Sequence, residues 1–104
     1  MINAKSFVIV RTYSAGVHVG RLSRRDGKEV VLTEARRIWR WRGANTLNEL
    51  AIRGASMDEH TRISEAFPGE VILTEAIEVI EVGEEAVVNL TTPESHYEVS
   101  RAAL

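Results

Sequence analysis

The stretch His18-Val-Gly-Arg-Leu-Ser-Arg-Arg-Asp-Gly-Lys-Glu-Val-Val-Leu-Thr33 decides the fold class of this chain. Its two ends are rich in apolar and β-branched residues, which favour extended strands. Asp26-Gly27 lies between them, and this dipeptide is a strong signal for a tight hairpin turn. The stretch therefore predicts two antiparallel strands, near residues 17–23 and 28–33, joined by a turn.

Strand signals continue on both sides of this hairpin. Residues 6–12 are β-branched and apolar and are followed by the turn Ser14-Ala15-Gly16, and a further strand is predicted near 36–41. We expect the four segments to form an antiparallel meander. A later run with dominant Val and Ile predicts at least one more strand, near 76–82.

Two short helices complete the predicted fold. Asn45 or Thr46 is a suitable N-cap, and Gly54 ends that helix by about residue 53. Residues 83–90 can form a second helix, because their acidic side chains come first, where the helix dipole favours them. Residues 56–68 are predicted to form a loop, and 93–104 fit either a helix or a tail.

The 104 residues suit one domain, which we assign to residues 1–104. The predicted fold class is α+β, a small antiparallel sheet of about four to five strands with one or two short helices. Deep clefts are hard to build in so small a domain, so a sizeable pocket is easier to form between subunits. We therefore expect a homo-oligomer, a dimer or a tetramer.

Charge is distributed unevenly along the chain. The first 53 residues contain eleven basic and four acidic side chains, whereas the remainder contains two basic and eleven acidic ones. This asymmetry indicates either an anion site on the basic half or basic and acidic surfaces that meet within or between subunits. The overall charge of −2 argues against long nucleic acid as the partner.

The densest binding chemistry lies in Ala35-Arg-Arg-Ile-Trp-Arg-Trp-Arg-Gly43. In an extended strand, Arg37, Trp39 and Trp41 share one face. Tryptophan rings stack on flat ligands and arginine forks onto phosphate oxygens. The other face carries Arg36, Ile38, Arg40 and Arg42, whose arginines we assign to solvent, acidic neighbours or a subunit interface. The alternative is that the two tryptophans belong to the core.

A second group of candidate ligand residues surrounds the first predicted turn. Arg11, Tyr13 and Ser14 offer a guanidinium, a ring and hydroxyls, and Gly16 permits a positive φ or a close backbone approach. His18 follows this turn and can titrate near neutral pH. The alternative is a plain β-turn with Tyr13 packed on the hairpin.

Several classes of site are disfavoured by composition. The chain has no cysteine, so it has no disulfide and no thiolate ligand or nucleophile. The three histidines lack metal-ligand spacing, and no Gly-rich phosphate loop or nucleophile elbow occurs. We therefore expect a non-enzymatic protein without a metal or a cofactor. Neither a signal sequence nor a membrane span is predicted, which favours the cytoplasm.

Four runs of the chain resemble a family of small bacteriophage proteins. They are Val10–Gly20, Asp26–Leu32, Ala35–Trp39 with Trp41 and Gly43-Ala44, and Ile72–Ile80. This family in turn resembles, and is expected to overlap, the phage anti-CBASS sponges, which are similar in size and bind cyclic dinucleotide signals in homo-oligomers without cleaving them. The resemblance implies ligand contacts at Arg11, Tyr13, Ser14, His18, Arg37, Trp39 and Trp41.

The resulting hypothesis is a phage immune-evasion protein in the host cytoplasm that sequesters a small nucleotide between subunits. Tryptophan and arginine also dominate the binding energy of protein interfaces, so an inhibitor of a host enzyme is one alternative. A small module for single-stranded nucleic acid is another, with arginines on the backbone and tryptophans under the bases.

Overall fold

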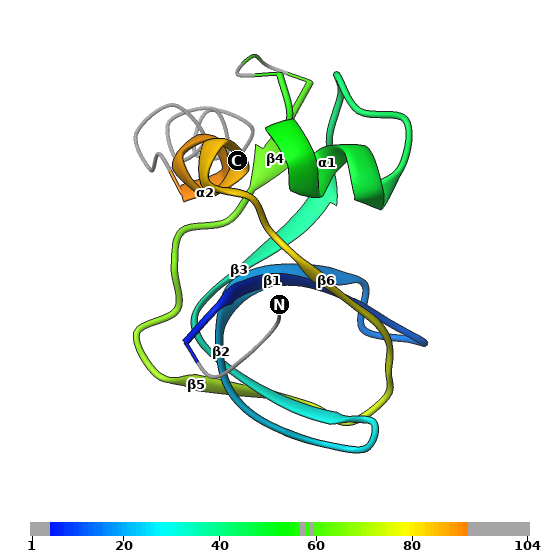
Figure 1. The fold of residues 1–104 in the computed structure, drawn as a ribbon, viewed down its shortest axis with the longest axis vertical. Helices are drawn as coiled ribbons and strands as arrows, with labels where there is room; N and C mark the ends of the chain where they lie inside the picture. Colours follow the sequence, from blue (N-terminus) through cyan, green and yellow to red (C-terminus); the bar gives the residue numbers. More distant parts are fainter. Residues whose placement is uncertain (1–4, 57, 59, 92–104) are drawn as a thin grey trace.

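The computed structural model describes residues 5–56, 58 and 60–91. Their strands and helices, in chain order, are β1 (Phe7–Thr12), β2 (Val17–Asp26), β3 (Glu29–Arg40), α1 (Leu47–Arg53), β4 (Arg62–Ile63), β5 (Glu70–Leu73), β6 (Ala76–Glu81) and α2 (Glu84–Thr91). Figure 1 shows the strands curved around an open ring, with both helices on one side of it. The predicted α+β class is confirmed.

The sheet is antiparallel in every pairing, as the predicted meander requires. Strands β1, β2 and β3 follow one another, and β6 pairs with the other side of β1. The outer edge of β3 pairs with β5 near its start and with β4 near its end. Because β5 and β6 lie at opposite edges but are joined by two residues, the sheet must curl into a small, partly open barrel.

Two hydrogen bonds hold the β5–β6 connection against the rest of the barrel. The Ala76 N–H donates to the Lys28 carbonyl at 3.0 Å, at the tip of the β2–β3 hairpin. The Tyr13 N–H donates to the Glu75 carbonyl at 2.9 Å, at the β1–β2 turn. This connection therefore links both hairpin turns of the meander.

The structure corrects two strand predictions. The strand predicted near 17–23 continues to Asp26, and β3 runs unbroken from Glu29 to Arg40, whereas two strands, 28–33 and 36–41, were predicted. Val19 pairs with Arg36 and Arg21 with Thr33. A single β2 residue, Gly20, therefore faces the pair Glu34-Ala35, which is a β-bulge with Glu34 at φ 53°. The bulge bends the strand without ending it.

Gly20 is required opposite this bulge because the two backbones approach closely. A Cβ atom there would lie 3.0 Å from Ala35 Cα and 3.1 Å from the Thr33 carbonyl oxygen. The bulge also changes which residues face the barrel interior. Before it, Val30 and Leu32 belong to the interior cluster, and after it Ala35 does, so the inward positions switch from even to odd numbers.

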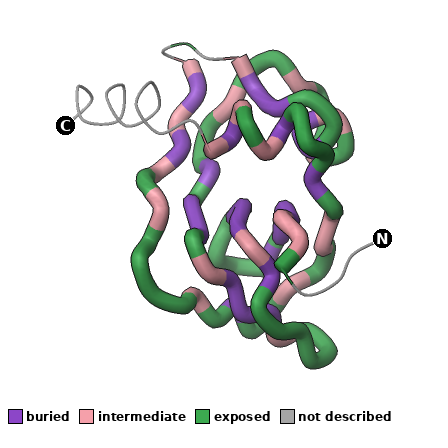
Figure 2. Tube along the Cα trace, turned by 60° about the vertical axis from the view of Figure 1, so that its left-hand side comes forward, coloured by how far each residue is buried: buried purple, intermediate pink, exposed green. Residues whose placement is uncertain are grey.

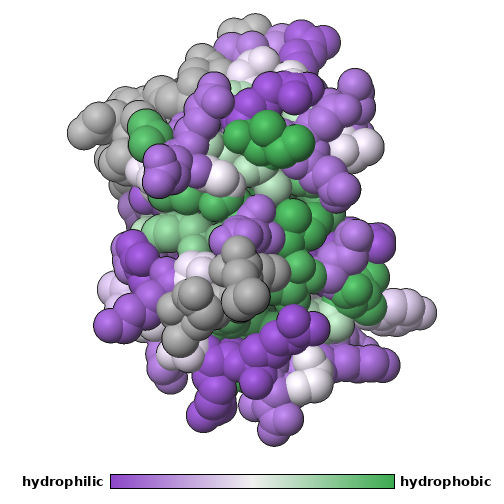
Figure 3. Space-filling model, in the orientation of Figure 1, coloured by the Kyte–Doolittle hydropathy of each residue, from purple (hydrophilic) through white to green (hydrophobic). Residues whose placement is uncertain are grey.

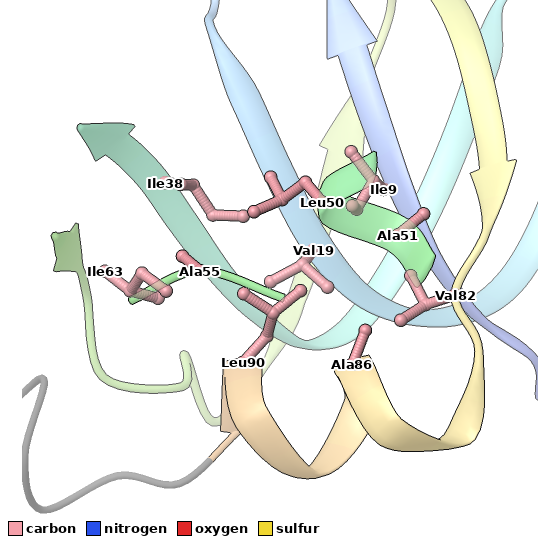
Figure 4. Close-up of a cluster of buried hydrophobic side chains, with 10 residues drawn as sticks. All are labelled: Ile9, Val19, Ile38, Leu50, Ala51, Ala55, Ile63, Val82, Ala86 and Leu90. Carbon is pink, nitrogen blue, oxygen red and sulfur yellow. The ribbon is translucent and has the colours of Figure 1, made fainter. Parts of the chain in front are cut away.

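Two apolar clusters stabilise the molecule on opposite faces of the sheet. Within β1, Val8 and Val10 point into the barrel, whereas Ile9 points toward the helices. The helix-side cluster consists of Ile9, Val19, Ile38, Leu50, Ala51, Ala55, Ile63, Val82, Ala86 and Leu90, drawn in Figure 4. Figure 2 shows that buried segments recur in both the strand and the helix regions.

Helix α1 follows the predicted signals closely. The Thr46 hydroxyl caps its N-terminus by accepting from the Glu49 N–H at 3.2 Å, and Gly54 ends it at φ 81°. Ala55, the residue after Gly54, is held by Asn89 of α2, whose side-chain amide exchanges two 2.8 Å hydrogen bonds with the Ala55 backbone. The two helices therefore form one layer over the sheet.

The remaining predictions have mixed outcomes. The helix predicted at 83–90 is α2, and the strand predicted at 76–82 is β6. The predicted 56–68 loop contains the two-residue strand β4, and β5 was not predicted. The stretch 93–104 lies outside the described residues. Within the described part of the chain, no helix is long and apolar enough to cross a membrane.

Candidate functional site

A cavity of about 280 Å³ lies beside the second half of β3, adjoining the interior of the barrel. Its lining residues are His18, Ala35, Arg36, Arg37, Ser64, Glu65, Ala66, Phe67, Pro68 and Val71. We call this cavity the His18 pocket. It contains two residues predicted from the sequence as ligand contacts, His18 and Arg37.

The segment that follows β4 forms one wall of the His18 pocket because it runs along the outer edge of β3. The Ser64 N–H donates to the Arg37 carbonyl at 2.9 Å, and the Arg37 N–H donates to Ser64 Oγ at 2.8 Å. The Phe67 N–H donates to the Ala35 carbonyl, also at 2.9 Å. Phe67 itself is 52 % exposed, so its ring is accessible to a ligand.

His18 and Arg37 come together because they are directly opposite each other on β2 and β3. The Arg37 Nε–H donates to His18 Nε2 at 3.3 Å, which places the imidazole proton on Nδ1. His18 is only 3 % exposed, and its Nδ1 has no hydrogen-bond partner among the described residues. Leaving such a buried donor unpaired costs about 1–3 kcal/mol, which a ligand acceptor can offset.

His18 is neutral at physiological pH. Burial disfavours the imidazolium and, together with the positive charge of Arg37, lowers the pKa of His18 from 6.5 to about 4. The histidine and the arginine therefore play different roles. Arg37 supplies the positive charge of the pair, and His18 supplies an uncharged N–H donor.

The His18 pocket offers, through its side chains, hydrogen-bond donors, a positive charge and an aromatic ring. Its Ser64 hydroxyl donates to the Glu65 carbonyl at 3.1 Å and accepts from the Arg37 N–H, so it is engaged by the backbone. Among the residues that the structure describes, no group of three or more His, Cys, Asp or Glu side chains is placed to hold a metal ion. A guanidinium, a neutral imidazole and an exposed ring can together hold a flat anionic molecule.

The residues predicted around the first turn form a separate group. Arg11 Nε contacts Glu78 Oε1 at 2.7 Å, and Ser14 Oγ donates to Glu75 Oε1 at 2.8 Å. Arg11, which was predicted to contact a ligand, therefore forms an exposed ion pair with a carboxylate of the same chain. Tyr13 is 79 % exposed rather than packed on the hairpin, and Gly16 has the positive φ, 83°, that was anticipated.

The two tryptophans have different environments, although they were predicted to share a face. Trp39 is 54 % exposed, two residues beyond Arg37 on β3. Trp41 follows the last residue of β3, packs against the helix-side cluster and donates its indole N–H to the Ala44 carbonyl at 3.2 Å. The prediction that Trp41 shares a strand face with Arg37 and Trp39 is wrong, because β3 ends at Arg40. The contacts of Trp41 instead match the alternative prediction that it belongs to the core.

Sequence reasoning missed Arg36 and Phe67 as lining residues. Arg36 was assigned to solvent, acidic neighbours or an interface, yet it is only 8 % exposed. The available signal was its alternation with Ile38, which placed it on an apolar face. For Phe67 the signal was a lone aromatic residue within a polar stretch, next to Pro68-Gly69.

Comparison with known proteins places the chain in a family. No curated protein and no solved structure matches the sequence. A family model described as a domain of unknown function, DUF6948, matches residues 5–90. The match extends from before β1 into α2, and it includes every residue that lines the His18 pocket. The chain therefore belongs to the DUF6948 family.

Proposed function

We propose that this protein is a non-enzymatic binder that sequesters a small nucleotide, of the cyclic dinucleotide class or related to it. The observation that carries the proposal is the His18 pocket, where one cavity is lined by Arg37, by His18, whose buried Nδ1 has no partner in the described chain, and by the exposed Phe67. The guanidinium suits a phosphate group, the imidazole suits an acceptor on the edge of a base, and the aromatic ring suits the face of a base.

Arg37 is the phosphate-binding group in this proposal. Its Nε atom contacts His18, and within the described part of the chain its two Nη atoms donate to no protein group. Phe67 and Trp39 offer exposed faces on which a base can stack, at about 1–3 kcal/mol for each base. His18 Nδ1 donates to an acceptor on the ligand, which relieves the cost of its unpaired burial.

The size of the pocket supports an assembly. A cavity of about 280 Å³ is slightly below the usual range of roughly 300–1,000 Å³ for small-molecule sites. One nucleotide unit is therefore the most that a single copy encloses, and a dinucleotide requires a further wall. A second copy of the chain supplies that wall in the proposed homo-oligomer, a dimer or a tetramer.

The biological role follows from the resemblance to small bacteriophage proteins. A protein that binds an immune signal tightly and is abundant in the host cytoplasm lowers the free concentration of that signal without cleaving it. Sequestration requires no catalytic residue, no metal and no cofactor. The proposed role is accordingly immune evasion by ligand capture.

Isothermal titration calorimetry tests the proposal with a panel of nucleoside monophosphates, cyclic mononucleotides and cyclic dinucleotides. We expect at least one cyclic dinucleotide to bind, and Arg37→Ala to weaken its binding by about 10-fold to 100-fold, because a charge-assisted hydrogen bond is lost. Arg25→Ala is the matched control, since Arg25 is an exposed arginine on the β2–β3 hairpin outside the pocket. Absence of binding by every member of the panel contradicts the proposal.

Two further measurements separate sequestration from its alternatives. Ligand recovered from the complex by chromatography must be chemically intact, because degradation products would assign the protein to an enzyme class. Native mass spectrometry of the loaded protein must show ligand bound to a dimer or a tetramer. Affinity that rises with oligonucleotide length and falls steeply with salt would instead indicate a single-stranded nucleic acid module.

A further inference from the structure

A second cavity, of about 310 Å³, lies where β3 meets the helix layer. It is lined by Phe7, Arg21, Glu34, Arg36, Ala66, Val87 and Thr91. We call it the Arg36 pocket. Arg36 and Ala66 line both this cavity and the His18 pocket, so the two cavities are neighbours that share one guanidinium.

Arg36 is a buried cation that the described chain satisfies poorly. Its Nη1 atom lies 3.3 Å from the Ser64 carbonyl oxygen, and its Nη2 atom lies 3.5 Å from that of Thr91. Both distances exceed the roughly 2.7–2.9 Å of charge-assisted hydrogen bonds. Within the described ranges, no carboxylate forms an ion pair with Arg36.

This burial has an energetic consequence. Desolvation lowers the pKa of Arg36, and the negative charges of Glu65 and Glu34 oppose that shift. A guanidinium remains protonated in proteins, so Arg36 stays charged. Its desolvation therefore lowers the stability of the folded state. A bound anion would offset that cost by pairing with the guanidinium.

The other charged groups of the Arg36 pocket leave its net charge positive. Arg21 and Glu34 neutralise each other through a contact of 2.9 Å between Nε and Oε2. Arg21 is also fixed by its 3.0 Å hydrogen bond to the Lys5 carbonyl and by its position 4.5 Å above the Phe7 ring. Arg36 therefore supplies the positive charge in this cavity that no ion pair with a described residue neutralises.

We propose that the Arg36 pocket is a second anion-binding site, which takes a phosphate group against the Arg36 guanidinium with Arg21 at its rim. This site is independent of the proposed function. One extension does rest on that function: a ligand with two phosphates can place one against Arg37 and the other against Arg36. Arg36 and Ala66 line both cavities, so the two sites adjoin each other.

Thermal unfolding with inorganic phosphate as the probe, against chloride at equal ionic strength, tests the second site. We expect phosphate to raise the Tm of the wild-type protein by about 4 °C or more, with saturation. Arg36→Met should fold, should be at least as stable as wild type without phosphate, and should lose this response. Arg25→Ala should retain it.

The location of the phosphate effect distinguishes the two sites. Backbone NMR shifts induced by phosphate in wild-type protein should centre on Phe7, Val87 and Thr91, a readout that does not depend on any variant folding. Shifts confined to His18, Phe67 and Val71, with the response lost in Arg37→Ala and kept in Arg36→Met, would overturn the second site and support the His18 pocket. The second site is also overturned if phosphate does not raise the Tm of the wild-type protein, or if it raises the Tm of Arg36→Met by the same amount.

Discussion

The two faces of β3 beyond its bulge differ in how they are covered. On the helix side, Ile38 is 1 % exposed and is sealed by Leu50 and Leu90, which are fully buried. On the other side, Arg37 and Trp39 remain exposed, and Arg37 lines the His18 pocket. Adjacent residues of one strand therefore have different surroundings: Ile38 lies in an apolar core cluster, whereas Arg37 lies at a cavity.

Polar satisfaction sharpens this contrast. The helix-side cluster consists of apolar side chains, and Asn89 exchanges both of its amide hydrogen bonds with the backbone of Ala55. Arg36, which alternates with Ile38 on this face, is the poorly paired exception beside the cluster. The barrel side leaves His18 Nδ1 without a partner in the described chain. Thr61 Oγ1, just before β4, is also buried without a partner among the described residues, so the case for a site at His18 rests on the adjoining cavity as well as on the unpaired donor. Surface hydropathy adds little to this distinction, because Figure 3 shows apolar patches over α1 as well.

The largest effect is expected on the helix side. Leu90→Ala should lower the free energy of unfolding by about 2–5 kcal/mol, because it removes a fully buried side chain and leaves a cavity between α2 and the sheet. Denaturant unfolding followed by circular dichroism measures this loss. Ligand affinity of the folded variant should stay within about 2-fold of wild type.

Val88→Ala is the control for Leu90→Ala, because Val88 lies on the same helix and is 68 % exposed. Its effect should stay within about 0.5 kcal/mol. Equal losses in the two variants would show that α2 is not sealed onto the sheet, and the contrast between the faces would fail.

The next largest effect is the contribution of His18, on the barrel side, to the free energy of unfolding, and it depends on pH. The folded-state pKa of His18 is lowered to about 4, so between about pH 6.5 and 4 the unfolded state binds a proton that the folded state does not. The stabilisation is therefore complete above pH 6.5 and is lost as pH falls through this window, by about 3 kcal/mol in total. Denaturant unfolding at a series of pH values measures the loss.

His18→Gln isolates this contribution from that of the carboxylates, which also titrate in acid. The difference in stability between wild type and His18→Gln should change by about 3 kcal/mol between pH 7 and pH 4. A difference that is constant over this range would mean that His18 has the same pKa in the folded and the unfolded state, so that its burial does not disfavour the imidazolium.

Local signals in the sequence predicted most of the fold. Asp26-Gly27, Thr46 and Gly54 mark turns and caps whose geometry depends on a few neighbouring residues, and all three are used as expected. The break predicted between residues 33 and 36 was wrong. A bulge and a turn have similar local signals, and the choice between them is made by pairing with Gly20, which is distant in sequence.

The candidate site could be predicted only in part, for the same reason. Strand alternation placed Arg37 and Trp39 on one face, but the bulge determines that this face adjoins the barrel interior. The wall formed by Ser64 and Phe67 comes from a segment about 30 residues away, held by backbone hydrogen bonds that have no side-chain signature. Long-range pairing is therefore the part that one sequence does not reveal.

The tryptophans provide a smaller and more direct comparison. Trp41→Ala should cost roughly 2 kcal/mol of stability, about half the loss for a fully buried aromatic residue, because Trp41 is half-buried against the helix-side cluster. Trp39→Ala should change stability by less than about 0.5 kcal/mol, because its ring is exposed. In calorimetry, Trp39→Ala should nevertheless weaken nucleotide binding by about 5-fold or more. The reverse pattern would mean that the assignments of the two rings are exchanged.

The smallest effect tests whether the helix layer can be loosened without altering the pocket. Thr46→Ala removes the hydroxyl that caps α1 and should cost about 1 kcal/mol, whereas Thr46→Ser keeps a capping oxygen and should cost less. Both losses are measured by denaturant unfolding. Because Thr46 does not line the His18 pocket, ligand affinity should be the same in both variants. A parallel loss of affinity in Thr46→Ala would show that the order of α1 is transmitted through β3 to the pocket, and the two faces would then act as one unit.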